Sequence, residues 1–399
     1  MSQPIKAVCL FLLILMPFAS ATAQGVPSKK DDALSLEKQR ALWLLDQLFE
    51  RAKACGDETF RIGAQSELAD LLWRYDEARA RAQFEEAFEA INAIELEAQG
   101  EPSDTPPPVE FGPQYQLRRM VLELIARHDT EWARKLGDQT GVESSTESDS
   151  QAHLPPAWTT PAVPSPPLKP FLANRSLRPT NAQDLLSQAD MARSPAEKDG
   201  LYARAALRAV VENDFERALS IAGKMSRGPS RLNVEAMARQ RAAMAALSKE
   251  DFVAVGQYAR DLPNLVQRAT IFDQLLRALE KRKDAGRAAE VLAEAEQSLG
   301  KAKDGPEKAH ALLIIAGAAA RLDPLRGFDI LTSAITAINH ADLDKKNSAG
   351  AFNFDQILPL LARADFDRLL QLAQSIESKE FSVLAQMAMC RAVLRPNGP

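Results

Sequence analysis

The amino-acid sequence predicts an all-α protein, in which antiparallel helical hairpins stack as an α-solenoid and a disordered Pro/Ser/Thr-rich linker separates two helical blocks. Three observations support this fold class. Seven aspartates share one pattern of apolar residues at helical spacing, thirteen of the 24 prolines concentrate in two short stretches, and the sequence has no useful run of strand-like alternation. At 399 residues the chain is long enough for two domains.

Residues 1–23 are expected to be a signal peptide. Lys6 supplies a positive charge, residues 7–18 form a short apolar run, and residues 21–23 (ATA) have the small side chains of a cleavage site. Cleavage there would make Gln24 the mature N-terminus. The apolar run is short for a bilayer span, so a retained anchor is the less favoured alternative. We expect an exported protein, periplasmic or extracellular, with no integral membrane span after signal cleavage.

Residues 31–137 form the predicted N-terminal helical block. The apolar pattern predicts one long helix over residues 31–54, and then a hairpin whose helices cover residues 57–75 and 76–99. A proline-rich loop over residues 102–113 follows, and a second hairpin turns at Asp129.

Residues 138–180 form the predicted linker. Eight prolines lie between Pro155 and Pro179, after an acidic run rich in serine and threonine over residues 143–150. Such a composition buries too little apolar surface to fold. A stiff spacer between the blocks is the expected role, and recognition of the Pro-rich segment by a partner is the alternative.

Seven aspartates mark the turns of the predicted hairpins: Asp76, Asp129, Asp214, Asp251, Asp284, Asp323 and Asp365. The positions eight, five and four residues before them are apolar in twenty of twenty-one cases, with Glu280 as the exception, and the fourth residue after each is small or apolar. One apolar stripe therefore stops at each aspartate and another begins. We expect each aspartate to cap the second helix of its hairpin.

Residues 181–395 form the predicted helical-repeat solenoid. The five aspartates from Asp214 to Asp365 follow one another at intervals of 37, 33, 39 and 42 residues, which are typical of two-helix repeats. Ser194-Pro195 and Asp323-Pro324 are strong helix-start signals, because each combines a capping side chain with proline at the first helical position. Residues 309–320 are apolar almost throughout and predict a helix buried on all sides.

This C-terminal block resembles the tetratricopeptide-like α-solenoids in a divergent form. Residues 214–218 (DFERA) look like that family's turn into the second helix, and Ala218 and Ala288 match its small packing position. The family's Gly and Tyr of the first helix are replaced, since Ala206 and Ala209 stand there in the Asp214 unit. The layout also resembles uncharacterised exported bacterial helical-repeat proteins, which carry over no activity. The resemblance implies stacked hairpins over residues 181–395.

Arginine follows the turn aspartate at the third place in five of the seven units: Arg79, Arg217, Arg287, Arg326 and Arg368. An arginine in the first turn of a helix opposes the helix dipole, so its recurrence needs an explanation. One hypothesis is an inter-repeat ladder, in which each guanidinium reaches its own cap aspartate or the carbonyl end of an adjoining helix. The other is a row of cations that binds acidic ligands. We favour the ladder, because the arginines recur in register with the caps.

Composition and motifs disfavour several function classes. A net charge of −5 and an aromatic content of 6% argue against a nucleic-acid partner. The sequence lacks the nucleophile motifs of hydrolases, a Gly-rich phosphate loop and a histidine pair at metal-ligand spacing. We therefore assign no catalytic, cofactor-binding or metal-binding residue and expect no cofactor. Cys55 and Cys390, which remain after signal removal, are expected to be buried and unpaired, because a bond would require the first and last hairpins to meet.

The expected function is that of an exported, non-enzymatic scaffold, which binds a protein or peptide on its helical-repeat surface. One alternative is an α/α-barrel-like hydrolase or lyase that acts on an extracytoplasmic polymer. A further alternative is a structural spacer in an envelope assembly. A cleft with converging carboxylates would distinguish the enzyme from the scaffold.

Overall fold

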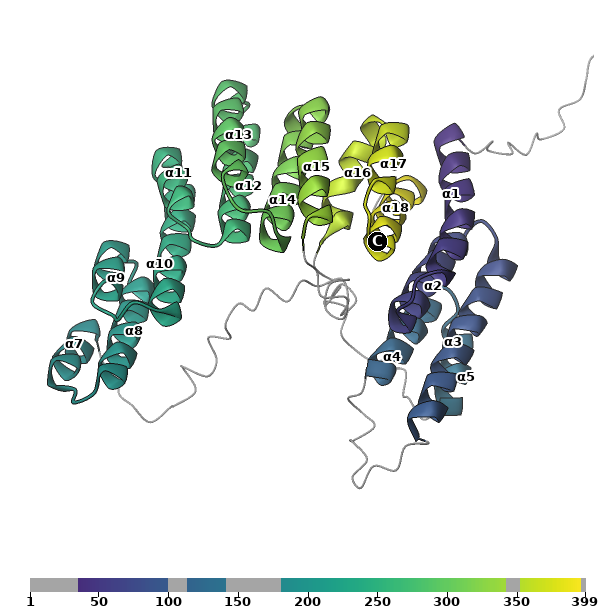
Figure 1. Ribbon diagram of the computed structural model, residues 1–399, viewed down its shortest axis with the longest axis horizontal. Coiled ribbons are helices and arrows are strands. Elements are labelled where there is room, and N and C mark those ends of the chain that lie inside the picture. Colours follow the sequence, from purple (N-terminus) through teal and green to yellow (C-terminus); the bar gives the residue numbers. More distant parts are fainter. Residues whose placement is uncertain (1–34, 100–112, 141–180, 342–351, 396–399) are drawn as a thin grey trace, which may run out of the picture. The chain divides into compact units, whose positions relative to one another are not determined.

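The computed structural model describes residues 35–99, 113–140, 181–341 and 352–395, and helices are the regular secondary structure in all four ranges (Figure 1). The prediction of an all-α chain of stacked hairpins is confirmed. The predicted signal peptide lies outside the described residues, as do residues 141–180 of the predicted linker. Helix α5 ends at Thr140, so it extends slightly into the range predicted for that linker.

The described residues of the N-terminal block form five helices. They are α1 (Leu36–Lys53), α2 (Glu58–Leu72), α3 (Glu77–Gln99), α4 (Pro113–Ala126) and α5 (Thr130–Thr140). Helices α2 and α3 pack on each other around the turn at Asp76, and α4 and α5 do so around Asp129. Both predicted hairpins of this block are therefore present.

The C-terminal block opens with α7 and closes with α18, and five hairpins lie between them. The helices are α7 (Ala182–Met191), α8 (Pro195–Val211), α9 (Phe215–Ala222), α10 (Pro229–Ser248), α11 (Phe252–Arg260), α12 (Leu265–Lys281), α13 (Ala285–Gly300), α14 (Pro306–Leu322), α15 (Pro324–Asn339), α16 (Phe354–Ala364), α17 (Phe366–Gln374) and α18 (Lys379–Leu394). Each hairpin turns at one of the five aspartates, so α8, α10, α12, α14 and α16 are first helices, and α9, α11, α13, α15 and α17 are second helices.

The repeating apolar pattern builds the core of every hairpin. The residue four places after each turn aspartate is buried in all seven units: Ala80, Ala133, Ala218, Val255, Ala288, Gly327 and Leu369. The second helix packs against the first at this position, where a small or apolar side chain permits close approach. Glu280, the exception in the apolar pattern, is exposed and forms an ion pair with Arg321 at 3.2 Å.

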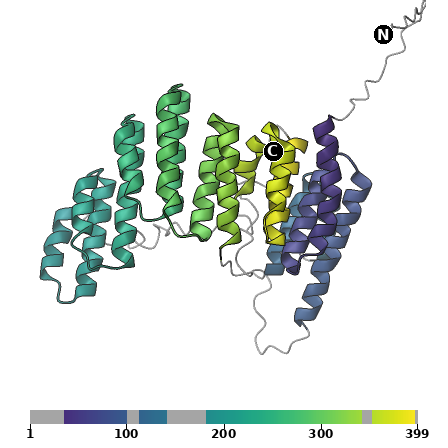
Figure 2. The ribbon, with the colours of Figure 1, turned by 45° about the horizontal axis from the view of Figure 1, so that its top comes forward.

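First helices pack directly on one another along the C-terminal block. Helix α8 contacts α10, α10 contacts α12, and the series continues through α14 and α16 to α18. Each second helix packs on its own first helix and on the first helix that follows. Among the described second helices, α15 and α17 also contact each other appreciably. Figure 2 shows these helices standing side by side. Side-chain contacts such as Arg326–Glu296 and Arg368–Asp329 connect neighbouring second helices.

Two second helices are longer than the others. Helices α13 and α15 have 16 residues each, whereas α9 has 8 and α11 and α17 have 9. At 1.5 Å per residue the long pair spans about 24 Å, nearly twice the length of the short ones. This long pair flanks helix α14.

Helix α14 is the apolar helix that the sequence predicts to be buried on all sides, and ten of its residues are buried. It approaches α15 closely at Gly327, where an added Cβ would lie 2.9 Å from Cα of Ala320. Only a residue without a side chain fits at that separation. Within the described ranges, no helix combines the length and the apolar character that a membrane crossing needs.

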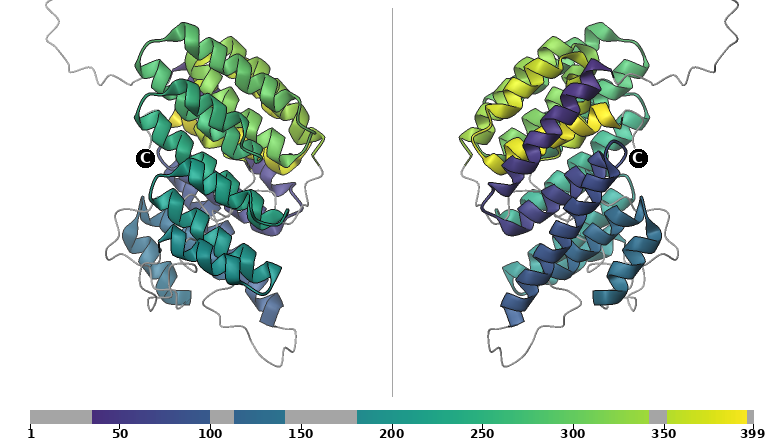
Figure 3. Two further views of the ribbon diagram at one scale, coloured as in Figure 1. Left: turned by 90° about the vertical axis from the view of Figure 1, so that its left-hand side faces the viewer. Right: turned by 90° about the vertical axis from the view of Figure 1, so that its right-hand side faces the viewer.

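The two helical blocks pack on each other rather than forming separate cores. Helices α1 and α2 contact α18 (Figure 3), and a single hydrophobic cluster runs from Ala41 to Leu394. Arg40 pairs with Asp367 at 2.9 Å across this contact, and the Tyr75 hydroxyl donates to the carbonyl oxygen of Leu394 at 3.3 Å. The row of repeats therefore continues from α18 into α1, although these helices lie at opposite ends of the described chain.

Cys55 and Cys390 are free and buried. The expectation that the first and last hairpins lie apart is wrong, because α1 and α2 contact α18. The two cysteines nevertheless do not bond to each other, and each thiol lies beside a backbone carbonyl. The Cys390 Sγ lies 3.5 Å from the carbonyl oxygen of Ala41, and the Cys55 Sγ lies 3.5 Å from that of Arg51. Burial raises the pKa of Cys55 to about 11 and that of Cys390 to about 12. Both thiols therefore stay protonated at neutral pH and react poorly.

Candidate functional site

The seven turn aspartates all act as helix caps. In each, a carboxylate oxygen accepts a hydrogen bond from a backbone N–H two or three residues later, at 2.9 to 3.2 Å: Asp76, Asp129, Asp214, Asp251, Asp284, Asp323 and Asp365. Three units add a second local feature, because Asn213, Glu250 and Lys283 have φ values of 61°, 60° and 59°. Each of these residues directly precedes its cap aspartate, so the chain reverses through a left-handed residue and caps the next helix at once.

The five recurring arginines all contact the second preceding helix. Arg79 on α3 pairs with Asp46 on α1 at 2.5 Å, and Arg368 on α17 pairs with Asp329 on α15 at 3.1 Å. Arg217 donates to the side-chain oxygen of Gln183 on α7 at 3.0 Å. These partners differ from the cap aspartates and helix-end carbonyls that the ladder hypothesis named. The contacts nevertheless connect one unit to the next.

Aromatic rings support several of these arginines. The Arg368 guanidinium lies 4.6 Å from the ring centre of Phe328, that of Arg79 lies 5.5 Å from Phe49, and that of Arg287 lies 5.9 Å from Phe252. A guanidinium over a ring face gains cation–π attraction while it keeps its hydrogen bonds. The arginines are therefore engaged within the row of repeats.

A groove of about 760 Å³ lies between the long second helices α13 and α15. Leu312 of α14 and Ile330 of α15 are buried and give the groove an apolar floor, and Leu325 stands at its rim with 65% of its surface exposed. The volume falls within the range of ligand-binding pockets. Helices α13 and α15 both pack on α14, which lies at the base of the groove between them.

Ion pairs set the charge pattern of this α13–α15 groove. Arg326 on α15 donates two hydrogen bonds to Glu296 on α13, at 2.7 and 2.9 Å, and so joins the two helices. The carboxylate raises the pKa of Arg326 through these hydrogen bonds. Asp304 accepts from Lys308 at 2.8 Å and contacts His340 at 3.5 Å, and the hydrogen bond from Lys308 lowers the pKa of this carboxyl. The groove is therefore bounded by two pairs whose charges are fixed at neutral pH.

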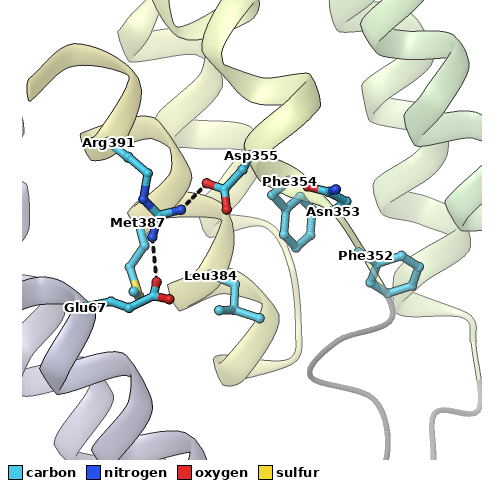
Figure 4. A pocket seen from close by; sticks show the side chains of 8 residues that line it. All are labelled: Glu67, Phe352, Asn353, Phe354, Asp355, Leu384, Met387 and Arg391. Atoms are coloured by element: carbon cyan, nitrogen blue, oxygen red, sulfur yellow. Dashed lines mark hydrogen bonds and ion pairs between the residues drawn. The ribbon is translucent and has the colours of Figure 1, made fainter. Parts of the chain in front are cut away.

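A second polar site lies where the N-terminal block meets α16 and α18. The Arg391 side chain of α18 lies between Glu67 of α2 and Asp355 of α16 (Figure 4), pairing with Glu67 at 2.5 Å and also with Asp355. Burial raises the pKa of Glu67, whereas the two carboxylates raise the pKa of Arg391 against the effect of burial. The adjoining cavity measures about 20 Å³, which holds a water molecule and no larger ligand. This cluster joins helices and does not form a binding pocket.

Asp70 is a further buried anchor beside that cluster. Its carboxylate lies 2.8 Å from Nε2 of His128 and 2.9 Å from the guanidinium of Arg395, and the His128 ring stacks on Trp73 with 4.7 Å between ring centres. Glu67, Asp70 and Arg391 are not among the site residues that the sequence pattern predicts. The sequence signal that could have revealed this site is the presence of acidic residues inside the apolar pattern of α2. Buried carboxylates need cationic or hydrogen-bonding partners, so such residues indicate a polar contact in the core.

Bonds within the protein engage the four groove carboxylates. Glu296, Asp304 and Asp329 are each paired with a cation, and Asp323 accepts the backbone N–H of Leu325 as a helix cap. Among the described residues no three His, Cys, Asp or Glu side chains are placed to hold a metal ion.

Comparisons with protein-family models, with curated proteins and with solved structures give no match for this chain. The fold and the groove therefore carry the functional argument.

Proposed function

We propose that this chain is an exported, non-enzymatic scaffold that binds a protein or peptide partner in the α13–α15 groove. The single observation that carries the proposal is the groove itself, because it combines about 760 Å³ of space with a buried apolar floor and an exposed Leu325. A concave surface that combines apolar side chains with a few polar groups is the usual form of a binding site. The repeats are a divergent form of the tetratricopeptide-like solenoid, and a nucleic-acid partner is not expected at an acidic groove.

The pairing of the groove carboxylates favours a scaffold over the alternative of a hydrolase or lyase. Glycoside hydrolysis uses two carboxyl groups that flank the bond to be broken, one of them kept protonated. In this groove the hydrogen bonds from Lys308 hold the pKa of Asp304 low, and Glu296 is committed to Arg326. These ion pairs do not favour a role for Asp304 and Glu296 as a catalytic acid and base.

Capture of partners from an extract of the source cell envelope tests the proposal. The mature chain, residues 24–399, is used as bait beside two variants, Ser333→Trp and Ser187→Trp. Both serines are exposed and donate to the carbonyl oxygen four residues earlier, at 3.3 and 3.2 Å, but only Ser333 lines the groove. We expect a partner that the wild type and Ser187→Trp retain and Ser333→Trp loses. If neither the wild type nor Ser187→Trp captures a partner, and the protein degrades an envelope polysaccharide, the scaffold proposal is contradicted.

Export is a separate part of the proposal. N-terminal sequencing of the protein from its native source checks it, and Gln24 is the expected first residue because residues 21–23 have the small side chains of a cleavage site. A native protein that retains residues 1–23 would instead favour an N-terminal anchor.

A further inference from the structure

Helices α8 and α10 present a stripe of side chains that the packing of the repeats does not bury. The residues of this stripe, which we call the α8–α10 face, are exposed or half-buried: Arg204, Leu207, Val211, Met237, Arg241 and Met244. Within each helix they are three, four or seven positions apart, so they lie on one side of that helix. The two helices pack directly on each other (Figure 1), and their stripes therefore form one surface.

The two arginines of this face occupy the same place in successive repeats. Arg204 lies ten residues before the cap Asp214, and Arg241 lies ten residues before the cap Asp251. Both first helices also end in the same way, through a left-handed residue directly before the aspartate, so they are in register. Axes of packed helices lie about 8–10 Å apart, which brings both arginines within reach of one bound peptide.

Neither of these two arginines is engaged with another part of the described protein. Both are exposed, and among the described residues neither side chain forms an ion pair, a hydrogen bond or a contact with an aromatic ring. The five recurring arginines of the second helices differ, because each contacts a residue of another helix. The α8–α10 face therefore offers two guanidinium groups whose hydrogen-bond donors are open to a ligand.

The local carboxylates do not neutralise these charges. The acidic residues of α8, its C-cap and α10 all accept hydrogen bonds from other groups: Glu197, Asp199, Glu212 and Glu235. None of these bonds comes from Arg204 or Arg241. The positive charge of the face is therefore left for a partner of opposite charge.

Apolar side chains flank the two charges. Val211 is 70% exposed and Met244 is 41% exposed, and methionine adapts its shape to different apolar partners. A ligand that fits has aliphatic groups beside its acidic ones. The six residues of the face include no aromatic ring on which a nucleic-acid base could stack, so the surface favours a peptide over a single-stranded nucleic acid.

We propose that the α8–α10 face binds an acidic peptide segment of a partner protein, in which Asp or Glu residues stand beside aliphatic ones. Carboxylates of the segment pair with Arg204 and Arg241, whose planar guanidinium groups match a carboxylate. Its aliphatic side chains pack on Val211 and Met244. The face shares no residue with the α13–α15 groove, so this second surface goes beyond the proposed function and does not depend on it.

Synthetic peptides test the inference on the chain that comprises residues 24–399. The probe is a ten-residue peptide of Glu, Leu and Gly. One control replaces every Glu by Lys, another replaces every Leu by Ser, and an oligothymidylate of the same length represents nucleic acid. Fluorescence anisotropy at physiological salt is expected to show the Glu/Leu peptide binding at least about tenfold more tightly than any control, with an affinity that falls as salt rises.

Matched variants locate the binding. Arg204→Gln and Arg241→Gln should each weaken it by about threefold and together by about tenfold, because exposed ion pairs are individually weak. Arg74→Gln removes an exposed arginine of the N-terminal block and should have no effect. Met244→Ser should weaken binding by about threefold, whereas Leu232→Ser, nine residues from Arg241 and so on the opposite side of α10, should not. All five positions are exposed, so each variant should melt at the wild-type temperature.

The outcomes separate this inference from the proposed function. Tighter binding of the Lys/Leu peptide or of the oligothymidylate overturns the inference, and so does absence of binding by the Glu/Leu peptide. Binding that the double arginine variant does not weaken overturns it as well. Ser333→Trp is expected to leave the peptide affinity unchanged, because Ser333 lines the α13–α15 groove. Loss of binding in Ser333→Trp, with the arginine variants unaffected, would assign the peptide to that groove and reject the α8–α10 face alone.

Discussion

Single residues at the turns decide where each helix stops and the next one starts. Asn213, Glu250 and Lys283 adopt left-handed backbone angles immediately before a cap aspartate. Asparagine tolerates this conformation, whereas a glutamate or lysine with a Cβ is strained there by about 1 kcal/mol. The strain persists because the following aspartate must face the first N–H groups of the second helix.

Replacing Lys283 by glycine should therefore stabilise the protein. Glycine adopts a positive φ without steric strain, and we expect the free energy of unfolding to rise by about 0.5–1 kcal/mol in urea denaturation. Glu290→Gly is the control, since Glu290 is an exposed residue inside α13, where glycine should cost about 0.5–1 kcal/mol. Equal destabilisation by both changes would show that the turn at Lys283 is not left-handed.

At the scale of helices, the contact between α14 and α15 is the tightest in the described repeats. Gly327 lets α15 approach Ala320 so closely that a Cβ would meet backbone atoms at 2.9 to 3.0 Å. Backbone atoms cannot move aside as a flexible side chain does, so the whole helix would have to shift. The position of α15, and with it the width of the α13–α15 groove, depends on this glycine.

Gly327→Ala is expected to lower the free energy of unfolding by about 1–3 kcal/mol. Gly286→Ala provides the matched control, because a Cβ at Gly286 meets nothing within 4 Å, and alanine should stabilise the first turn of α13 by about 0.4–1 kcal/mol. Thermal and urea melts of the two variants measure both effects. Unchanged stability of Gly327→Ala would mean that α14 and α15 do not approach as described.

At the scale of the whole molecule, the N-terminal block extends the row of repeats beyond α18. The contact combines the shared hydrophobic cluster with buried polar links, notably Arg391 between Glu67 and Asp355 and Arg395 against Asp70. The hydrophobic cluster supplies most of the stabilisation, because separating the blocks would expose its apolar surface to water. The blocks should behave as one folding unit.

Cleavage of the chain between α5 and α7 should therefore leave the blocks associated. A protease site inserted within residues 141–180 permits the cut after folding, and size-exclusion chromatography should show both fragments eluting together. Glu67→Ala removes one of the two carboxylates that pair with the half-buried Arg391 and should weaken the association by about 1.5–3 kcal/mol, the usual worth of a hydrogen bond to a charged group. The exposed Glu85→Ala in α3 is the control. Fragments that elute separately without mutation would contradict the packing of α1 on α18.

Local features could be predicted from the sequence, and contacts between distant segments could not. Each cap aspartate and the small residue four places after it depend on neighbours within one hairpin, so the periodicity reveals them. A left-handed Asn213 is foreseeable from residue type, but Glu250 and Lys283 are not, because the fold imposes that conformation on them.

The groove and the contact between the blocks depend on longer-range packing. Arg326 pairs with Glu296, which lies thirty residues, or about one repeat length, earlier in the sequence. An acidic residue one repeat before an arginine is therefore the sequence signal for an ion pair between neighbouring second helices. Glu67 and Arg391 are 324 residues apart, and no local pattern connects them. The α13–α15 groove depends on two long second helices packed on one side of α14, which becomes visible only once the hairpins are stacked.

The central claim is that the α13–α15 groove is the binding site, and hydrogen exchange tests it most directly. Amide exchange of residues 24–399 is measured by mass spectrometry, alone and with a partner obtained in the capture experiment. We predict slower exchange in α13, α15 and residues 301–305, because a bound partner shields these segments and stabilises them against local opening. Protection confined to the first helices or to α1–α5, with α13 and α15 unchanged, would contradict the account.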